Sequence, residues 1–345
     1  MRRAVRAPVC YSMNTLSTLL FFILFLSACS PKEPALLVGN TMGTTYSVKI
    51  VGEVKEIENL QIQLDEELQN INDLMSTYIV DSELSKFNQS PMNTSFPLSR
   101  ENFEVFSIAK EIHAASGGQF DVTIGPLVNL WGFGPDFKEL IVPADKDILL
   151  AKSKVGMQFL KMSANAVSKT EAVYVDLSAI AKGYGVDVIA DLLDAKGYEN
   201  YLVEIGGELR AKGLNDRGKY WRVAIEKPDV MQRTPYKAIE LRNSAMATSG
   251  DYRNYFEVDG VRFSHTISPI SGRPITHNVA SVTVIEPSTA KADGYATAIN
   301  VMGVDEGIKM SDELGLAVLI IIKTENGFEE RYSSKYKGLI ESQQD

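Results

Sequence analysis

The chain has few of the residues from which metal and nucleophile sites are commonly built. It contains two cysteines, Cys10 and Cys29, and three widely spaced histidines, His113, His265 and His277. This scarcity argues against a zinc site, which needs several such ligands close together. Also absent are the Gly-Lys-Ser/Thr end of a P-loop, the Gly-x-Gly-x-x-Gly of a Rossmann fold and the Gly-x-Ser-x-Gly of a serine hydrolase. A nucleotide would therefore have to bind by another scheme.

A surplus of positive charge is missing as well. The 345 residues include 35 Lys and Arg against 44 Asp and Glu, and the net charge is −9. Because no basic face stands out, we expect no nucleic acid among the partners. An apolar fraction of 45% and a charged fraction of 23% are ordinary for a globular protein, and this length can bury a sizeable core. Neither an internal repeat nor an interdomain linker is evident, so we predict one catalytic domain.

The N-terminus has an apolar run, residues 19–26, that is too short to span a bilayer. Arginines precede it, as in a targeting segment. The run ends in Leu26-Ser27-Ala28-Cys29, which resembles the lipobox of bacterial lipoproteins, in which the cysteine becomes the lipidated first residue. The alternative is an ordinary signal peptide with a chance cysteine. We predict a signal peptide over 1–28, a lipidated tether over 29–35 and a catalytic domain over 36–345.

Apolar periodicity predicts both helices and strands. Helices are expected over 57–75 and 289–302, after a cap at Ser99, and after a cap at Ser178 with Ala181, Val188 and Leu192 directed inward. Strands are expected over 173–177, 201–205, 279–285 and 316–322, as a pair or one bent strand over 37–51, and as a hairpin of 254–258 with 261–265 around Asp259-Gly260. This uneven alternation predicts an α+β (mixed α/β) domain, with a mixed, largely antiparallel sheet and flanking helices.

Two oxygen-bearing side chains, Asp293 and Thr297, lie four residues apart in the predicted helix 289–302. Residues at this spacing project from one face of a helix. A carboxylate and a hydroxyl suit Mg²⁺, which prefers oxygen and often completes its shell from substrate phosphates. An acidic protein that binds a pyrophosphate needs a cation between the two. We therefore predict a magnesium site here.

Glycine or small residues beside a polar or aromatic group recur in five segments of the chain. Each is weak evidence alone, because such segments are usually turns or helix ends. Their number, at junctions between strands and helices, favours a binding site. The segments are 41–44, 117–121, 176–187, 206–208 and 248–253.

Seven ordered motifs together resemble one family, from about Gly39 to the last strand. They read Thr-Met-Gly-Thr, Phe-Asp-Val-Thr-Ile-Gly-Pro-Leu-Val, Asp-Leu-Ser-Ala-Ile-Ala-Lys-Gly-Tyr, Val-Glu-Ile-Gly-Gly, Thr-Ser-Gly-Asp-Tyr-Arg, His-Thr-Ile-Ser-Pro-x-x-Gly-Arg-Pro and Ala-Asp-x-x-Ala-Thr-Ala. This combination is similar to the ApbE family of FAD:protein FMN transferases. The resemblance implies a mixed α/β fold and a Mg²⁺-dependent reaction that splits FAD, attaches FMN through a phosphoester to a threonine or serine of another protein, and releases AMP.

The resemblance also implies roles for individual residues. The magnesium ion would be held by Asp293, Thr297 and the backbone carbonyl of Ala179, and His265 would take the proton from the acceptor hydroxyl. The flavin nucleotide pocket would contain Met42, Tyr78, Gln119, Phe120, Asp121, Asp176, Lys182 and Ile267. The expected acceptors are subunits of membrane redox complexes, of the Na⁺-translocating quinone reductase or Rnf type.

Two other interpretations remain open at this point. One is a periplasmic FAD pyrophosphatase that yields FMN and AMP, although a tyrosine at the position of Tyr78 goes with transferases in this family. The other is a lipoprotein that binds FAD without catalysis. For the location we expect a lipid-anchored protein that faces the periplasm of a Gram-negative bacterium, with the inner membrane favoured over the outer because the expected acceptors are there.

Overall fold

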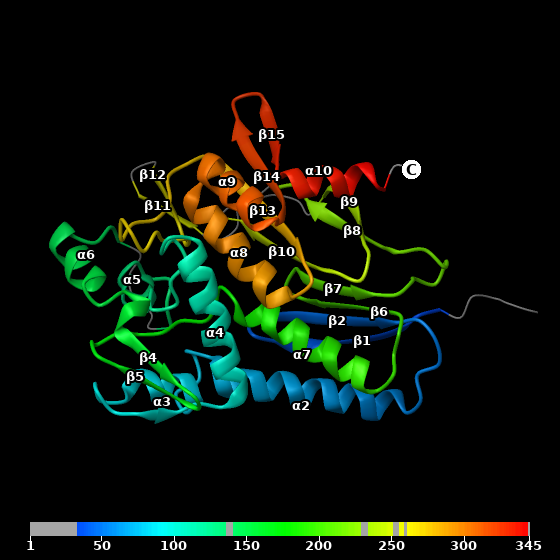
Figure 1. The fold of residues 1–345 in the computed structure, drawn as a ribbon, viewed down its shortest axis with the longest axis horizontal. Helices are drawn as coiled ribbons and strands as arrows, with labels where there is room; N and C mark the ends of the chain where they lie inside the picture. Colours follow the sequence, from blue (N-terminus) through cyan, green and yellow to red (C-terminus); the bar gives the residue numbers. More distant parts are fainter. Residues whose placement is uncertain (1–32, 136–140, 229–233, 251–254, 259–260, 344–345) are drawn as a thin grey trace, which may run out of the picture. The chain divides into compact units, whose positions relative to one another are not determined.

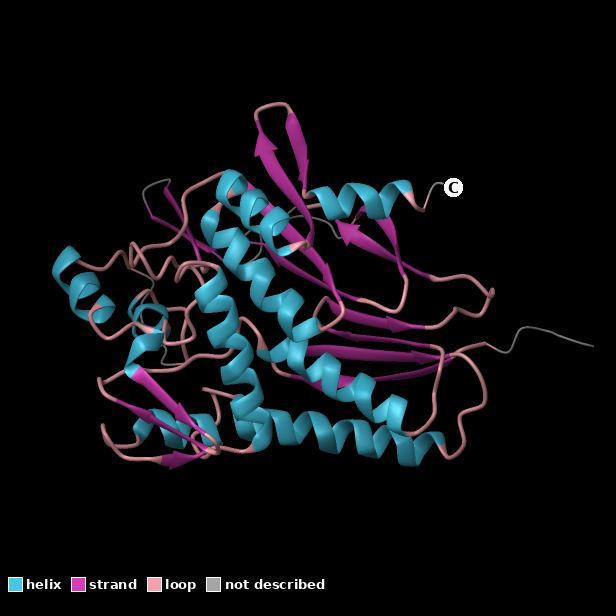
Figure 2. Ribbon diagram, in the orientation of Figure 1, coloured by secondary structure: helices cyan, strands magenta, loops and turns pink. Residues whose placement is uncertain are grey.

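An eight-stranded antiparallel sheet frames the part of the chain that the structure describes (Figures 1 and 2). The strand order is β1-β2-β6-β7-β10-β13-β14-β15, and each neighbouring pair is antiparallel. The strands are β1 (Ala35–Thr41), β2 (Thr44–Ile50), β6 (Tyr201–Ile205), β7 (Glu208–Lys212), β10 (Ala245–Gly250), β13 (Val279–Glu286), β14 (Ala317–Thr324) and β15 (Gly327–Tyr332). The predicted mixed α/β domain with a largely antiparallel sheet is confirmed.

The structure is a computed structural model that describes residues 33–135, 141–228, 234–250, 255–258 and 261–343. From Pro34 onward the chain forms one compact unit. The predicted signal peptide, the lipidation site at Cys29, the Asp259-Gly260 turn and residues 251–253 lie outside the described residues. Within them, no helix combines the length and the hydropathy that crossing a membrane requires.

Seven shorter strands form three smaller sheets beside the main one. They are β3 (Phe96–Pro97), β4 (Leu160–Ser163) and β5 (Ala166–Lys169) in one sheet, β8 (Trp221–Glu226) with β9 (Pro235–Leu241), and β11 (Tyr255–Val258) with β12 (Val261–Ser264). The last pair is the predicted hairpin.

Helices cover one face of the main sheet. Leucines of α2 and aliphatic residues of α7 pack on the inward side chains of β1, β2 and β6, while α8 packs on β10 and β13. The helices are α2 (Ile57–Met75), α3 (Glu83–Gln89), α4 (Arg100–Ala115), α5 (Gly125–Leu130), α6 (Asp145–Lys152), α7 (Ala181–Ala195), α8 (Thr289–Met302), α9 (Val304–Leu314) and α10 (Ser334–Glu341). A short 3₁₀ helix spans Met157–Phe159.

The opposite face of the sheet carries a second apolar layer, formed by the β8–β9 pair and α10. Strand β14 lies between the two layers: Val318 and Ile320 pack on the α8 side, whereas Leu319 and Ile321 pack towards β8–β9. A strand that is buried on both faces needs an unbroken apolar sequence. This explains the continuous run over residues 316–322.

A buried strand was predicted over 173–177. The burial is confirmed, but the segment does not form a strand. Val173, Val175 and Leu177 are buried, yet the segment makes only an isolated bridge, between Tyr174 and Ile124. The backbone of Val175 is held by a side chain instead: Asn88 Oδ1 accepts from its N–H at 2.7 Å, and Asn88 Nδ2 donates to its carbonyl at 2.8 Å. An asparagine amide has the donor and acceptor of a neighbouring strand.

The helix that was expected to begin after Ser178 begins at Ala181. Ser178 does not cap it, because its N–H and hydroxyl both donate to Asp176 Oδ1, at 2.9 and 2.5 Å. The buried face is also rotated from the expected one. Ala181, Val188 and Leu192 are half-buried, and the fully buried positions are Gly183, Tyr184, Gly185, Val186, Ile189, Ala190 and Leu193.

Candidate active site

A cavity of about 390 Å³ lies where α7, α8 and the segment that follows β12 meet. Eight residues predicted for the site line it: Tyr78, Asp176, Ala179, Lys182, His265, Ile267, Asp293 and Thr297. The other lining residues are Ile124, Val128, Phe133, Ser178, Gly206, Glu208, Thr248, Ser249, Gly250 and Thr266. Residues from seven separate parts of the sequence thus converge on one space.

One side of the cavity, the helix wall, is lined by Ala179 and Lys182 at the start of α7 and by Asp293 and Thr297 of α8. Asp293 is only 5% exposed, and its Oδ2 accepts a hydrogen bond from the Gly183 N–H at 3.1 Å. In a regular helix that N–H would donate to the carbonyl of Ala179. Among the backbone hydrogen bonds of the described residues, none joins Gly183 to Ala179. The Ala179 carbonyl is therefore left available beside the cavity.

The helix wall depends on a close approach of α7 to α8 at Gly183. A Cβ atom there would lie 2.5 Å from the Thr289 carbonyl oxygen and 2.8 Å from the Asp293 Cβ, both shorter than real contacts. Only glycine permits this approach of two backbones. The absent side chain of Gly183 therefore lets Asp293 reach its N–H group.

The N-terminus of α8 is fixed to α7 by Asp187. Its Oδ1 accepts from the N–H and the hydroxyl of Thr289, at 2.9 and 2.8 Å, and its Oδ2 accepts from the Ala290 N–H at 3.0 Å and the Ser288 hydroxyl at 2.8 Å. The first N–H groups of a helix have no hydrogen-bond partner inside the helix. A carboxylate at this end also interacts favourably with the positive end of the helix dipole. Asp187 thus holds α8 in the position that presents Asp293 and Thr297.

Three charged groups meet at the base of the helix wall. Lys182 Nζ lies 2.9 Å from Glu208 Oε1 and 4.0 Å from Asp293 Oδ2. Burial opposes the charge on Lys182, but the carboxylates of Asp293 and Glu208 outweigh it and raise its pKa. Burial raises the pKa of Glu208 to about 7, against the effect of Lys182. Burial raises the pKa of Asp293 as well. The cluster contains one positively charged side chain, Lys182, and two carboxylates, Glu208 and Asp293. This arrangement favours the binding of a further cation beside it.

The opposite side of the cavity, the hairpin wall, consists of His265–Ile267 and the rings of Phe133, Phe256 and Phe263 behind them. The His265 ring lies edge-on to Phe133, with centroids 6.3 Å apart. Phe133 contacts Phe256, which stacks on Phe263 at 5.2 Å. Following β12, the Ile275 N–H donates to the Thr266 carbonyl at 3.0 Å. Ring packing and a returning loop therefore position His265.

Trp131 belongs to the support of the hairpin wall and does not line the cavity. It is 1% exposed, it stacks on Phe263 at 5.7 Å, and its Nε1 donates to the Gly272 carbonyl at 3.0 Å. Its ring therefore packs in the core and does not offer a face to a planar ligand in the cavity. Tyr78, which is 67% exposed, instead presents its ring at the cavity itself.

Four residues predicted for the flavin pocket, Met42, Gln119, Phe120 and Asp121, are not among the residues that line the cavity. Asp121 uses both carboxylate oxygens inside the protein, one for the N–H and hydroxyl of Thr123 and the other for the Met157 N–H. His113 Nδ1 lies 3.4 Å from it. Phe120 is 3% exposed, in the main core. Contacts of these four residues with a flavin stay predictions.

The residues of the helix wall fit a magnesium ion by their chemistry. Asp293 offers a carboxylate, Thr297 a hydroxyl one turn further along α8, and Ala179 a carbonyl released from helix bonding. All are hard oxygen donors. Over the described residues no three His, Cys, Asp or Glu side chains are grouped to hold a metal. A cation here would thus take part of its shell from substrate oxygens or water, as magnesium in nucleotide sites commonly does.

Comparison with known proteins agrees with this geometry. The ApbE family matches residues 42–320, the part of the chain that contains the whole cavity. The chain belongs to the ApbE family. A relative from Vibrio cholerae, named FAD:protein FMN transferase, is 48% identical over 92% of this chain and 96% of its own length. One from Haemophilus influenzae with the same name is 42% identical over 93% and 96%.

Solved structures of ApbE proteins share the fold. The flavin transferase ApbE from Vibrio cholerae superposes with a TM-score of 0.84 at 47% identity, over 89% of this chain and 99% of that one. The apo form of the flavinyl transferase ApbE from Pseudomonas stutzeri gives 0.83 at 39% identity, over 89% and 96%. The family membership indicated by the seven motifs is therefore confirmed.

Two residues with clear structural roles at this ApbE site were not predicted as site residues: Glu208, which lines the cavity, and Asp187, which holds α8 in place. Glu208 is 3% exposed, and its Oε2 is buried without a hydrogen-bond partner. The sequence does mark it, since it follows the paired glycines Gly206 and Gly207, but the ion pair with Lys182 joins segments 26 residues apart. Asp187 lay within a segment noted for its glycines, but nothing local shows that it caps a helix a hundred residues later.

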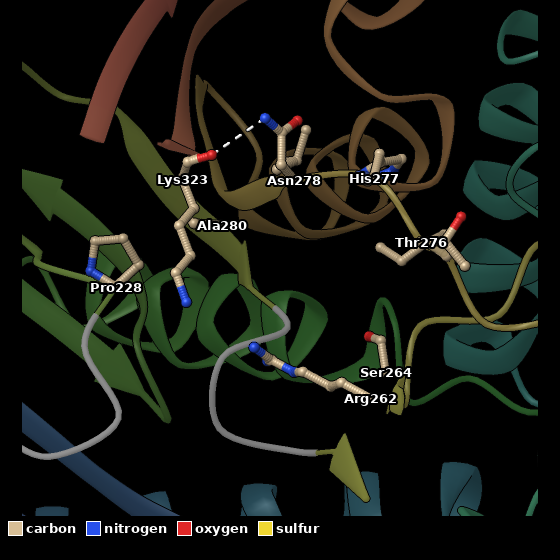
Figure 3. Close-up of a pocket in the computed structure, with 10 residues that line it drawn as sticks. Pro228, Arg262, Ser264, Thr276, His277, Asn278, Ala280 and Lys323 are labelled. Carbon is tan, nitrogen blue, oxygen red and sulfur yellow. Dashed lines mark hydrogen bonds between the residues drawn. The ribbon is translucent and has the colours of Figure 1, made fainter. Parts of the chain in front are cut away.

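A second, more basic cavity of about 230 Å³ lies beyond strand β12 (Figure 3). Ser264 lines it, whereas the next residue, His265, lines the first cavity. Figure 3 shows Arg262 and Lys323 extending into this space, with Pro228 at its edge. None of the predicted site residues borders it, so it is separate from the candidate active site of this ApbE-family chain.

Proposed function

We propose that this chain transfers FMN from FAD to a threonine or serine hydroxyl of another protein, with Mg²⁺, and releases AMP. The observation that carries the proposal is the helix wall, where the Asp293 carboxylate, the Thr297 hydroxyl and the Ala179 carbonyl border the same cavity as His265. The names of the relatives, FAD:protein FMN transferase, support the same activity.

The protein's own residues account for most of such a reaction. The acceptor oxygen forms a bond to the FMN phosphorus, the pyrophosphate bond breaks, and the hydroxyl proton passes to His265 as general base. Lys182 provides a fixed positive charge near the departing AMP. Asp293, Thr297 and Ala179 would hold Mg²⁺, which when bound neutralises the charge of the pyrophosphate. Phosphoryl-type transfer depends mainly on positioning and charge, and both walls provide these.

The test is to incubate the full chain with FAD, Mg²⁺ and the acceptor-bearing subunit of a Na⁺-translocating quinone reductase or an Rnf complex. We expect an in-gel fluorescent acceptor band and a mass increase equal to bound FMN, both lost in excess EDTA. Labelling at an unchanged rate in EDTA would refute the metal requirement. Free FMN without labelled protein would indicate a pyrophosphatase, and intact FAD a carrier that only binds it.

The proposal includes a location. We propose that Cys29 is lipidated and that it anchors the domain at the periplasmic side, at the inner membrane in preference to the outer. The acceptors expected for such an enzyme are subunits of membrane complexes, which supports an anchored transferase. Labelling cells with a palmitate analogue tests this: the chain should take up label and a Cys29→Ala variant should not. An unlabelled wild type would contradict the anchor.

A further inference from the structure

Strand β10 ends beside the active-site cavity with three lining residues to which the proposed reaction assigns no role. They are Thr248, Ser249 and Gly250, the start of the Thr-Ser-Gly-Asp-Tyr-Arg motif. Thr248 shares a hydrogen bond of 2.9 Å with Thr283 on the neighbouring strand β13, so its hydroxyl is engaged inside the sheet. Gly250 has no side chain. Ser249, which is half-buried, is therefore the residue here whose side chain can serve a ligand.

The Ser249 hydroxyl is held from one side by Asn300 of α8. Asn300 Nδ2 donates to Ser249 Oγ at 3.1 Å, so the serine oxygen is the acceptor of this bond. A serine hydroxyl also carries one hydrogen that it can donate. Among the residues that the structure describes, none accepts this hydrogen. Because Ser249 lines the cavity, its donor is available to a molecule bound there.

Asn300 holds Ser249 at the expense of its own hydrogen bonding. Its side chain is completely buried, and its Oδ1 has no hydrogen-bond partner among the described residues. An unpaired buried carbonyl is destabilising, whereas an apolar residue of similar shape would avoid this penalty. A buried polar group that is only partly satisfied therefore calls for an explanation other than stability. The bond to Ser249 provides one, because it fixes the direction in which the hydroxyl can donate.

The space beside Ser249 is where the proposed function places the pyrophosphate of FAD. Thr297, one of the proposed magnesium ligands, precedes Asn300 by three residues, so both project from the same side of α8. Lys182 and Asp293 lie along the same wall of the cavity. Charged phosphate oxygens are strong acceptors, and donors that are fixed around them in advance assist transfer. A hydroxyl with an uncommitted hydrogen meets this requirement.

We infer that Ser249 is a further catalytic residue, whose hydroxyl donates a hydrogen bond to a pyrophosphate oxygen of FAD, and that Asn300 is its positioning residue. The inference rests on the proposed function, since it requires a dinucleotide phosphate in this cavity. Ser249 keeps its proton throughout and forms no covalent bond to the substrate. Its hydrogen bond strengthens as negative charge builds up around the reacting phosphorus, so it lowers the barrier more than it tightens binding.

The first test removes the hydroxyl. Ser249→Ala should lower kcat for FMN transfer to the acceptor-bearing subunit of a Na⁺-translocating quinone reductase by about 10- to 100-fold, as expected for a hydrogen bond to a charged group. The KM for FAD should change far less, and Ser249→Thr, which restores a hydroxyl, should recover most of the rate. An unchanged kcat in Ser249→Ala would overturn the inference.

Ser281→Ala on β13 is the matched control for this variant. The Ser281 Oγ is also buried without a hydrogen-bond partner among the described residues, but Ser281 does not line the cavity. Its removal should therefore leave kcat at the wild-type value. A loss of kcat as large as that of Ser249→Ala would show that the rate responds to any change in these strands, which would contradict a specific role for Ser249.

The second test separates positioning from a structural role. Asn300→Leu removes both the amide that holds Ser249 and the unpaired Oδ1, so stability in urea should be equal or higher. The kcat should nevertheless fall by about three- to tenfold, because the Ser249 hydroxyl can then rotate away from the substrate. In a Ser249→Ala background, Asn300→Leu should have no further effect. Losses that multiply in the double variant would contradict the positioning role.

The third test places the contact on a phosphate oxygen. FAD analogues with sulfur in place of one non-bridging pyrophosphate oxygen accept a weaker hydrogen bond at that atom. With the wild type, the analogue whose sulfur faces Ser249 should react more slowly than FAD, and this difference should shrink in Ser249→Ala. If every analogue had the same relative rate with both enzymes, Ser249 would not contact the pyrophosphate. Failure of the proposed function would look different, since the wild type itself would then transfer no FMN from FAD.

Discussion

The two sides of the cavity are built by different physical means. The helix wall is fixed by backbone contacts: Gly183 permits an approach that leaves no room for a Cβ atom, and Asp187 holds the first N–H groups of α8. The hairpin wall is fixed by aromatic rings packed behind His265. Backbone contacts set the positions of Asp293 and Thr297 narrowly. Side-chain packing leaves His265 dependent on the fit of several rings.

This contrast matches the chemistry proposed for each side. A magnesium site requires oxygen ligands at nearly fixed distances. A general base must reach a hydroxyl that belongs to another protein, and its geometry tightens when the substrate arrives. Changes to the helix wall should therefore affect metal dependence and stability, whereas changes to the hairpin wall should affect the transfer step alone.

The largest effect is expected for Asp293→Asn. Of the three predicted metal ligands only Asp293 carries a charge, and a catalytic metal contributes several kcal/mol of charge stabilisation. Turnover with FAD and acceptor should fall by about 10³-fold, since each 1.4 kcal/mol is a factor of ten. The fold should persist, because the asparagine Oδ1 can still accept from the Gly183 N–H. Turnover and circular dichroism measure the two outcomes.

Asp121→Asn is the matched control for this carboxylate. Its oxygens bond to Thr123 and Met157 inside the protein, so the variant should lose thermal stability while the Mg²⁺ concentration for half-maximal turnover stays unchanged. If both variants shifted the Mg²⁺ requirement equally, the special position of Asp293 would be disproved.

On the hairpin wall, His265→Ala should lower the rate of FMN transfer by about 10²-fold, as is typical for loss of a general base. FAD affinity, measured by fluorescence, should change far less, because the helix wall is untouched. His113→Ala provides the control: its Nδ1 contacts the Phe120 carbonyl at 2.8 Å, outside the cavity, so it should affect stability and not transfer. Equal losses of rate and FAD affinity in His265→Ala would mean that His265 only shapes the pocket.

The packing of the helix wall is tested by Gly183→Ala. The added methyl group would meet the Thr289 carbonyl and Asp293, and overpacking of this kind costs about 1–3 kcal/mol. Urea unfolding should show this loss. Gly338→Ala in α10, where a Cβ meets nothing within 4 Å, should instead stabilise by up to about 1 kcal/mol. If the two substitutions have the same sign, the close approach at Gly183 does not limit stability.

Local sequence patterns predicted most of the helices and strands of the main sheet and its covering layer. Helices α2 and α8 have the predicted bounds, and the β1–β2 pair turns at Met42 and Gly43, both with positive φ. The segment 173–177 shows what local sequence patterns cannot predict. The predicted burial was correct, but the backbone is held by the side chain of Asn88, 87 residues away, and by the backbone of Val122 and Gly125. A burial pattern does not reveal which group will satisfy the backbone.

In the site, too, local spacing predicted some features, and tertiary packing determines the others. The spacing of Asp293 and Thr297 follows from helix geometry, and the structure does bring both into one cavity with Lys182 and His265. Asp121 and Asp176 look alike in sequence, each followed two residues later by a hydroxyl residue that donates to it. Only Asp176 lines the cavity. What separates them is tertiary packing, since Asp121 also receives the Met157 N–H.

The smallest effect concerns Glu208, the buried acid at the base of the helix wall. Its pKa in the folded chain, about 7, lies above that of an unfolded glutamate, so the folded state holds the proton more tightly. The stability that this adds is complete below about pH 4.5 and is lost as the pH rises through 7. From pH 6 to pH 7 the wild type should therefore lose on the order of 1 kcal/mol relative to Glu208→Gln, which has no proton to release.

Urea unfolding of the metal-free chains at several pH values measures this difference. The exposed Glu329→Gln on β15 is the control and should follow the wild type. The direction is the informative part, because an acid stabilised mainly by its ion pair with Lys182 would have a lowered pKa, so its stability would not change between pH 6 and pH 7 and would fall only below about pH 4.5. Wild-type stability that stays level with that of Glu208→Gln from pH 6 to pH 7 and falls only below about pH 4.5 would show that the lysine dominates over burial, and Glu208 would then be fully ionised at neutral pH.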